Sequence, residues 1–246
     1  MPENSQRAQH EINHGQLLAD GGAESIWGWG TAAGKIRAQR RAEWIVQAAG
    51  LKPATRALEI GCGTGNFTEL FAQSGADILA LDISEDLLFH ARQRELPRTV
   101  RFICSPFEGL SSDEPFDAII GSSVLHHLDI ELALGHIFRL LKPGGIMAFA
   151  EPNMLNPQIM VQSNIPWLRK RMGYSPDEIP FFRWSMQRKM AQAGFVDIRI
   201  TPRDWLHPST PPSWIRGVQK MEVILEGIPL ARDFAGSIYM TGRHPE

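Results

Sequence analysis

The sequence predicts an α/β fold built on a doubly wound, mostly parallel sheet with helices on both faces. From residue 56 to residue 150, short apolar segments of strand length alternate with segments whose apolar residues recur at helical spacing. Such alternation is typical of parallel sheets, because a crossover helix must return the chain before each new strand. The second observation is a run of alternate glycines, Gly61, Gly63 and Gly65, between the first strand and the next helix. In these sheets, that turn is where ligands bind.

Each element has its own signal. Gly50 and Pro53 mark the end of a first helix over 33–49, and Ser84 stands where it would cap the helix that begins at residue 85. Lys142 to Gly145 is expected to form a turn. Strands are predicted at 56–60, 77–82, 100–104, 116–121, 146–150, 195–201 and 236–242, with further helices from residue 66 and over 130–141, 183–193 and 213–226.

The pattern runs without a linker, which favours a single domain over residues 1–246. Residues 1–50 form an N-terminal arm and helix, and the polar residues 1–24 are expected to be mobile. Residues 55–152 form the core. Two inserts, 153–182 and 206–234, interrupt the alternation and are expected to be helical caps over the substrate.

Composition excludes several classes of protein. A net charge of −2 and a pI near 6.5 give no electrostatic footprint for nonspecific nucleic-acid binding. Two cysteines, Cys62 and Cys104, suggest a reducing compartment, and each is expected to be a small buried side chain. No apolar run reaches the roughly 20 residues that span a bilayer, and the start is polar rather than signal-like. We therefore expect a cytoplasmic protein with no transmembrane segment.

The glycine loop distinguishes two kinds of ligand. The third glycine of the Rossmann dinucleotide fingerprint would fall on position 66, where the chain has Asn66. Asp82 closes the second strand, where a carboxylate is expected to meet two ribose hydroxyls. The loop therefore favours a nucleoside without a pyrophosphate over a dinucleotide such as NAD.

These residues also carry a family resemblance. The segment 59–65, Glu-Ile-Gly-Cys-Gly-Thr-Gly, resembles motif I of the class I S-adenosylmethionine-dependent methyltransferases. The agreement continues in the family's order through 81–84, 116–128 and 141–145, and is closest to the branch with the ubiquinone- and menaquinone-pathway enzymes. It covers about 55–152 and, more loosely, 183–202. The resemblance implies a seventh, antiparallel strand and transfer of the cofactor's methyl group to an O, N or C nucleophile of a small molecule.

The resemblance also implies a cofactor site. The backbone from Gly63 to Asn66 would meet the methionine carboxylate, and the main chain at Ser122 the methionine amine. The chain has Pro106 where the family usually has an aspartate for adenine, so we expect apolar contact with Ile83 and Phe107 instead. The expected cofactor-binding residues are Glu59, Gly61, Cys62, Gly63, Gly65, Asn66, Asp82, Ile83, Pro106, Phe107 and Ser122.

Three residues could take part in catalysis. His126 and His127 follow the fourth strand near the expected methyl group, and imidazole is well suited to accept a proton at neutral pH. Glu151 closes the fifth strand and could orient a substrate hydroxyl. The alternatives are that the histidines are structural and that Glu151 binds loop amides. No familiar metal-ligand spacing is present, so no metal is expected.

The N-terminal segment allows two interpretations. Trp27 and Trp29 could close over the cofactor or anchor the first helix. Arg37 and Arg41 belong to a basic cluster that could be a solvated face, or could bind the cofactor carboxylate or an anionic substrate.

The acceptor is expected to be an apolar or aromatic small molecule enclosed by the inserts. The same residues could also form ordinary core, a lipid surface or an oligomer interface. The lining is predicted from Met154, Leu155, Ile159, Met160, Ile165, Trp167, Leu168, Phe181, Phe182, Trp205, Trp214, Ile215, Met221, Ile224 and Leu225.

The sequence also allows three alternative functions. One is a non-catalytic cofactor-binding sensor or partner subunit, and another is an NAD oxidoreductase, which Asn66 disfavours. The third is nucleic-acid methylation, but base-methylating relatives have an Asn/Asp-Pro-Pro-aromatic motif where this chain has Ser122 to Leu125. We expect no nucleic-acid partner. The sequence leaves the acceptor, the methylated atom and the oligomeric state open.

Overall fold

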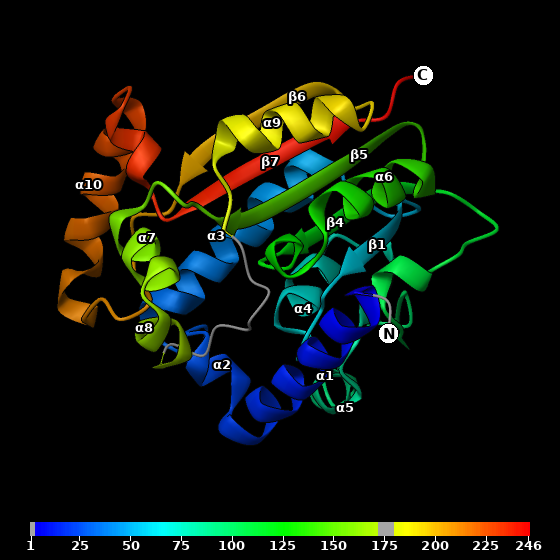
Figure 1. The fold of residues 1–246 in the computed structure, drawn as a ribbon, viewed down its shortest axis with the longest axis horizontal. Coiled ribbons are helices and arrows are strands. Elements are labelled where there is room, and N and C mark those ends of the chain that lie inside the picture. The colour runs from blue at the N-terminus through cyan, green and yellow to red at the C-terminus, as the bar shows by residue number, and fades with distance from the viewer. Residues whose placement is uncertain (1–2, 172–179) are drawn as a thin grey trace.

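A computed structural model describes residues 3–171 and 180–246 of the chain, and in these residues seven strands form one sheet (Figure 1). The strand order is β3-β2-β1-β4-β5-β7-β6. β1 pairs in parallel with both β2 and β4, and β7 runs antiparallel to β5 and β6. The strands are β1 (Arg56–Ile60), β2 (Asp77–Asp82), β3 (Val100–Cys104), β4 (Phe116–Ser122), β5 (Leu141–Pro152), β6 (Val196–Arg203) and β7 (Ser237–Arg243). The predicted doubly wound fold is confirmed, with its order reversing between β1 and β4.

Helices cover both faces of the sheet because its strands are apolar on both sides. On one face lie α3 (Ala32–Ala49), α4 (Asn66–Ala72) and α5 (Glu85–Arg92), packed on small strand residues such as Ala57 and Ala148. On the other face lie α6 (Ile130–Leu140) and α9 (Arg183–Gln192), packed on larger ones such as Leu58 and Phe149. Successive strand residues therefore alternate between two cores.

The remaining helices lie beyond the carboxyl ends of the strands (Figure 1). They are α1 (Glu3–Gly21), α2 (Ala23–Ile26), α7 (Pro157–Asn164), α8 (Pro166–Arg171) and α10 (Ile215–Gly227), with short 3₁₀ turns η1 (Phe107–Gly109), η2 (Leu125–His127), η3 (Pro212–Trp214) and η4 (Ala231–Phe234). Among the described residues, no helix is long and apolar enough to cross a membrane. The cytoplasmic location and the single domain stay predictions.

The polar N-terminal segment contains a helix, α1, which packs on α5 with Leu18 against Leu87. The expected mobility of residues 1–24 stays a prediction. The contact is so close at Gly15 that a Cβ there would lie 2.5 Å from Ser84 Oγ. The expected turn at Lys142–Gly145 lies inside β5, because Leu141 already pairs with Phe116 and a register shift absorbs the bend.

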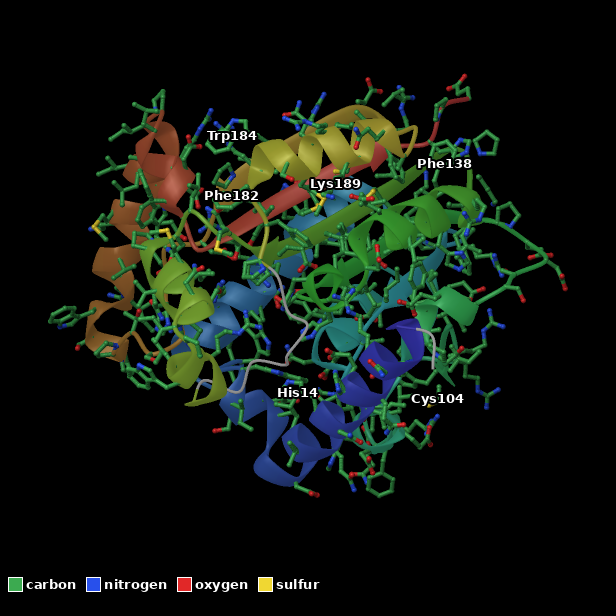
Figure 2. The ribbon with its side chains drawn as sticks, viewed as in Figure 1. His14, Cys104, Phe138, Phe182, Trp184 and Lys189 are labelled. Carbon is green, nitrogen blue, oxygen red and sulfur yellow. The ribbon has the colours of Figure 1, made fainter. Side chains whose placement is uncertain are left out.

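The two cysteines differ in their environments. Cys62 is buried as expected, whereas Cys104 is exposed, which corrects the expectation of a buried side chain (Figure 2). The reason is topological, since Cys104 ends β3, the strand at the edge of the sheet. Ser84 caps α5 as predicted, with its hydroxyl accepting a hydrogen bond from the N–H of Leu87 at 3.3 Å.

Candidate active site

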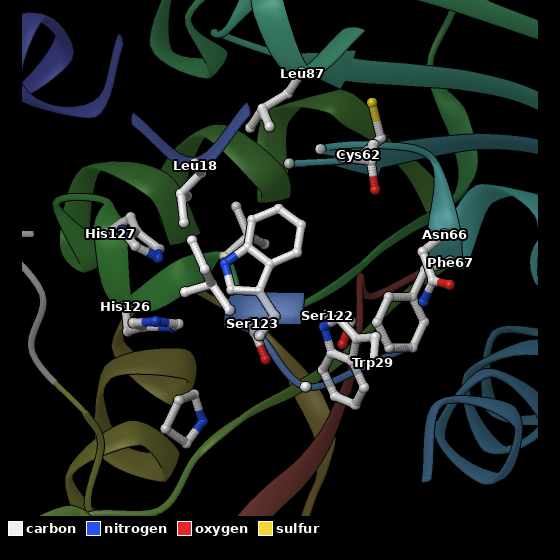
Figure 3. Close-up of a pocket in the computed structure, with 18 of the residues that line it drawn as sticks. Leu18, Trp29, Cys62, Asn66, Phe67, Leu87, Ser122, Ser123, His126 and His127 are labelled. Atoms are coloured by element: carbon white, nitrogen blue, oxygen red, sulfur yellow. The ribbon is translucent and has the colours of Figure 1, made fainter. Parts of the chain in front are cut away.

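A cavity of about 610 Å³ opens at the carboxyl ends of β1, β2 and β4, where the strand order reverses. Its walls come from the glycine loop, the segment after β4, helix α1, the Trp27–Trp29 segment and the 204–209 segment. In the close-up, His126 and His127 lie on one side of the pocket and Cys62 and Asn66 on the other (Figure 3). The cavity is therefore large enough for two reactants and has a different chemistry on each side.

The glycine loop brings backbone to the cavity wall. Gly63 and Gly65 have left-handed φ angles of 52° and 78°, which a side-chain-bearing residue rarely adopts. A Cβ on Gly63 would also lie 3.1 Å from the Trp27 ring, which covers the loop. Trp27 and Trp29 both line the cavity. The loop thus needs glycine for its turn and for close contact.

Asp82 is held rigidly at the edge of this loop. One carboxylate oxygen accepts the N–H of Gly63 at 2.7 Å, and the other accepts the N–H of Ser84 at 2.9 Å. Burial raises the pKa of Asp82, although these two amides counteract the shift. Each oxygen keeps a further lone pair, so the carboxylate can still accept two hydroxyl hydrogens.

The predicted cofactor residues divide into two groups. Gly61, Cys62, Gly63, Asn66, Asp82, Ile83, Phe107 and Ser122 line the cavity. Glu59, Gly65 and Pro106 are not part of its lining, and their roles stay predictions. Gly65 packs on Ala91 instead. Glu59 is buried beneath the loop, and burial raises its pKa to about 8.

His126 and Glu151 form a buried pair. Nδ1 of His126 lies 2.7 Å from Oε2 of Glu151, whose Oε1 accepts the N–H groups of Val124 and Leu125, each at 3.0 Å. Burial by itself would raise the pKa of Glu151. The hydrogen bonds to its carboxylate outweigh this effect and lower the pKa. A charged carboxylate can only accept a hydrogen bond, so Nδ1 of His126 carries the donated hydrogen and Nε2 is left as the basic nitrogen.

The two histidines have different partners. His126 lines the cavity and is 6% exposed. The His127 ring lies beside it at a tilt of 40°, with centroids 4.2 Å apart, and its Nδ1 lies 3.0 Å from Oε2 of Glu11 on α1. Glu151 itself is fully buried and does not reach the cavity. Of the two alternatives for Glu151, the carboxylate bonded to loop amides is the one observed.

An arginine network that the sequence did not predict forms the floor of the cavity. Arg41 is 1% exposed, and its guanidinium donates to Ser122 and Ser123 on one side and to Asp204 and Ser237 on the other, at 2.7–3.0 Å. Ser123 and Asp204 both have left-handed φ angles, 58° and 72°. Such strain persists only where the surroundings enforce it.

Two arginines share the one carboxylate of Asp204. Nε of Arg37 donates to it at 3.2 Å, and Tyr239 donates its hydroxyl to the other oxygen at 2.8 Å. Burial by itself would raise the pKa of Asp204. The positive charges of Arg37 and Arg41 outweigh this effect and hold the pKa well below its usual range. Both guanidiniums also lie over the Trp29 ring, at 5.5 and 5.2 Å from its centroid. The interpretation of Arg37 and Arg41 as a solvated face is wrong.

The inserts contribute less to the cavity than expected. Ile159 and Trp205 line it, as predicted, together with residues 206–209. By contrast, Trp214, Met221 and Ile224 are exposed to solvent. Among the other predicted lining residues, Phe181 and Ile215 are buried in the apolar cores, while Met160, Trp167 and Phe182 are exposed. Periodicity predicted the helix at α10 but not which of its faces would be buried.

Comparison with known proteins identifies the family. Residues 58–149 match the profile of a methyltransferase domain. Over 160 residues the chain is 36% identical to a ubiquinone biosynthesis O-methyltransferase of Methylococcus capsulatus, covering 60% of this chain and 68% of that protein. The chain belongs to the class I S-adenosylmethionine-dependent methyltransferases. Its cofactor is S-adenosylmethionine.

Two further proteins are similar to this methyltransferase at lower identity. It is 28% identical to nodulation protein S of Rhizobium tropici over 135 residues, which are 53% of this chain and 57% of that protein. A solved S-adenosylmethionine-dependent methyltransferase from Thermotoga maritima superposes with a TM-score of 0.64 at 20% identity, covering 94% of this chain and 99% of that one. That similarity shows the fold alone.

The residues of the cavity fit this cofactor. Asp82 presents a carboxylate at the cavity edge, and Gly61 and Gly63, both with left-handed φ angles, bring backbone to the cavity wall. Among the described residues, Nε of Arg41 is a buried donor without a hydrogen-bond partner, and its side chain lines the cavity. A buried unpaired donor is costly unless a ligand satisfies it.

Proposed function

We propose that this methyltransferase methylates a hydroxyl oxygen of a small, largely apolar molecule, with His126 as the general base. The observation that carries this proposal is the His126–Glu151 pair at the cavity wall, opposite the glycine loop. A hydroxyl must lose its proton as it becomes an ether, and a positioned imidazole can accept it. The Methylococcus relative, named an O-methyltransferase, supports oxygen as the acceptor atom.

Each group would have a separate role in holding the cofactor. Asp82 would accept hydrogen bonds from both ribose hydroxyls, and Nε of Arg41 would donate to the methionine carboxylate. Ile83 and Phe107 would contact the adenine. When bound, S-adenosylmethionine supplies a methyl group already activated by its sulfonium, so the protein need not activate the donor.

What the chain supplies is alignment, dry surroundings and a proton acceptor. Trp27 and Trp29 line the cavity, with Trp27 against Gly63 of the loop, and would exclude water there. Holding two reactants in line corresponds to effective molarities of roughly 10⁵–10⁸ M in well-oriented cases. Glu151 acts as a positioning residue, because it fixes the imidazole and directs the proton to Nδ1. The proton taken from the acceptor then rests on Nε2.

The cofactor assignment is tested by calorimetry. S-Adenosylhomocysteine is expected to bind, and NAD is not. Asp82→Ala should weaken S-adenosylhomocysteine binding by about 1–3 kcal/mol, the scale of hydrogen bonds to a charged group. Asp86→Ala, an exposed carboxylate of α5, is the control and should leave the affinity unchanged. Binding of NAD without S-adenosylhomocysteine, or an unchanged affinity in Asp82→Ala, would contradict the assignment.

The acceptor side is tested by Trp205→Ala. Trp205 lines the cavity, so its loss should raise KM for the acceptor while the affinity for S-adenosylhomocysteine is kept. Trp214→Ala is the matched control, because Trp214 is 68% exposed outside the cavity. Methyl transfer from radiolabelled cofactor to metabolite extracts identifies an acceptor for the assay. If no extract component is methylated although the cofactor binds, the non-catalytic sensor or partner subunit becomes the better assignment.

A further inference from the structure

Helix α10 and the segment after it present apolar side chains to solvent. Val223 is 74% exposed and Ile224 63% exposed, although both lie in the middle of the helix. We define the α10 face as the exposed residues Trp214, Met221, Val223, Ile224, Ile228, Leu230 and Phe234. Large apolar side chains exposed together on one helix and the segment after it are typical of an interaction site.

The same helix turns its carboxylates inward. Glu222 accepts the N–H of Trp205 at 2.7 Å and forms an ion pair with Arg40. Both oxygens of Glu226 accept hydrogen bonds from Arg40 at 2.7 Å. A helix that faces water does the reverse, burying its aliphatic residues and exposing its acids. The arrangement indicates that the outer face of α10 meets an apolar phase.

The charges on the outer face all have one sign. At 100° per residue, Arg216 and Lys220 fall within the same arc as Val223, Ile224 and Met221, and both are exposed. Within α10, all of which the structure describes, both acids lie on the inner side. Aliphatic and aromatic residues combined with cations are typical of helices that lie in a membrane interface.

We propose that the α10 face docks on the surface of an anionic lipid bilayer. Anionic head groups would complement Arg216 and Lys220, while the aliphatic residues enter the boundary with the acyl chains. A second copy of the chain fits the face less well. Two-fold packing would bring the same two cations together without a carboxylate of that face between them.

The segments next to the α10 face also support docking on a bilayer. Residues 207–209 line the cavity, and η3 and α10 follow them in the chain. Phe182 and Trp184, both exposed, lie on the same side of the molecule in Figure 2. An ion pair between Arg183 and Asp233, 3.2 Å long, connects that part of α9 to η4. A docked face would place the cavity beside the bilayer.

Vesicle flotation tests the proposal with the full-length protein. The probes are phosphatidylcholine vesicles and phosphatidylcholine vesicles that contain phosphatidylglycerol. We expect binding to the mixed vesicles that weakens with salt. Lys220→Gln should lower the partition coefficient about fivefold, the contribution of one cation near an anionic surface. Ile224→Glu should abolish binding.

The control variant is Phe89→Glu. Phe89 is 61% exposed on α5, away from α10, so this variant should float like the wild type. Unchanged S-adenosylhomocysteine affinity shows that each variant is folded. If the wild type does not bind the mixed vesicles, or Ile224→Glu still binds them, the proposal is wrong. A dimer in solution that Ile224→Glu dissociates, without vesicle binding by the wild type, would assign the face to a second copy instead.

Discussion

His126→Ala is expected to lower kcat by roughly 10²–10⁴-fold, the usual contribution of a positioned general base. The reason is local: Glu151 holds the ring by Nδ1 and leaves Nε2 as the basic nitrogen at the cavity wall. The affinity for S-adenosylhomocysteine should stay nearly unchanged. Radiolabelled methyl transfer gives kcat, and calorimetry gives the affinity.

His127→Ala is the matched control for this prediction. His127 also lines the cavity, but its Nδ1 faces Glu11 of α1 rather than Glu151. We expect a much smaller loss of kcat. Glu151→Gln should lower kcat while the affinity for S-adenosylhomocysteine is kept, because it removes the charge that holds the proton on Nδ1. If both histidine variants retain kcat, catalysis proceeds by alignment alone.

Asp204→Asn is expected to lower the free energy of unfolding by about 3–5 kcal/mol, the cost of leaving a buried charge without its partner. Asp204 is the carboxylate shared by Arg37 and Arg41, and all three lie below the cavity. Asp77→Asn serves as the control. It breaks an exposed ion pair with Arg101, which contributes about 0–1 kcal/mol. Urea denaturation measures both. Equal effects of the two variants would contradict the structural role of the network.

The same carboxylate predicts how stability depends on pH. In the unfolded chain Asp204 titrates near its ordinary pKa of 3.8, and in the folded chain its pKa is lower. Its stabilising contribution is therefore complete above the unfolded pKa and is lost as the pH falls through the folded one. Wild-type protein should lose stability more steeply than Asp204→Asn below about pH 4. Parallel acid titrations of the two proteins would contradict the assigned shift.

Much of the fold was predictable because its signals are local. The bounds of β1, β2 and β3 match the predicted strands residue for residue, since short apolar runs ended by turns define them. Asp82 was predictable as a site residue, because it closes a strand beside a glycine loop and parallel strands end at the same edge of a sheet. His126 follows the end of β4, and Glu151 lies at the end of β5, which is the neighbour of β4 in the sheet.

The sequence by itself therefore determined the order of the strands, the glycine loop and the family. Only the tertiary structure decided which polar groups meet. Arg41 and Asp204 are 163 positions apart, and no spacing rule connects them until α3 packs beside the end of β6. The tertiary structure also decided the orientation of α10, because the pattern of its residues allows either face to be buried. Arg40 on α3 fixes this orientation through its ion pairs with Glu222 and Glu226. Which face of a helix is buried depends on the residues that it packs against and not on the helix alone.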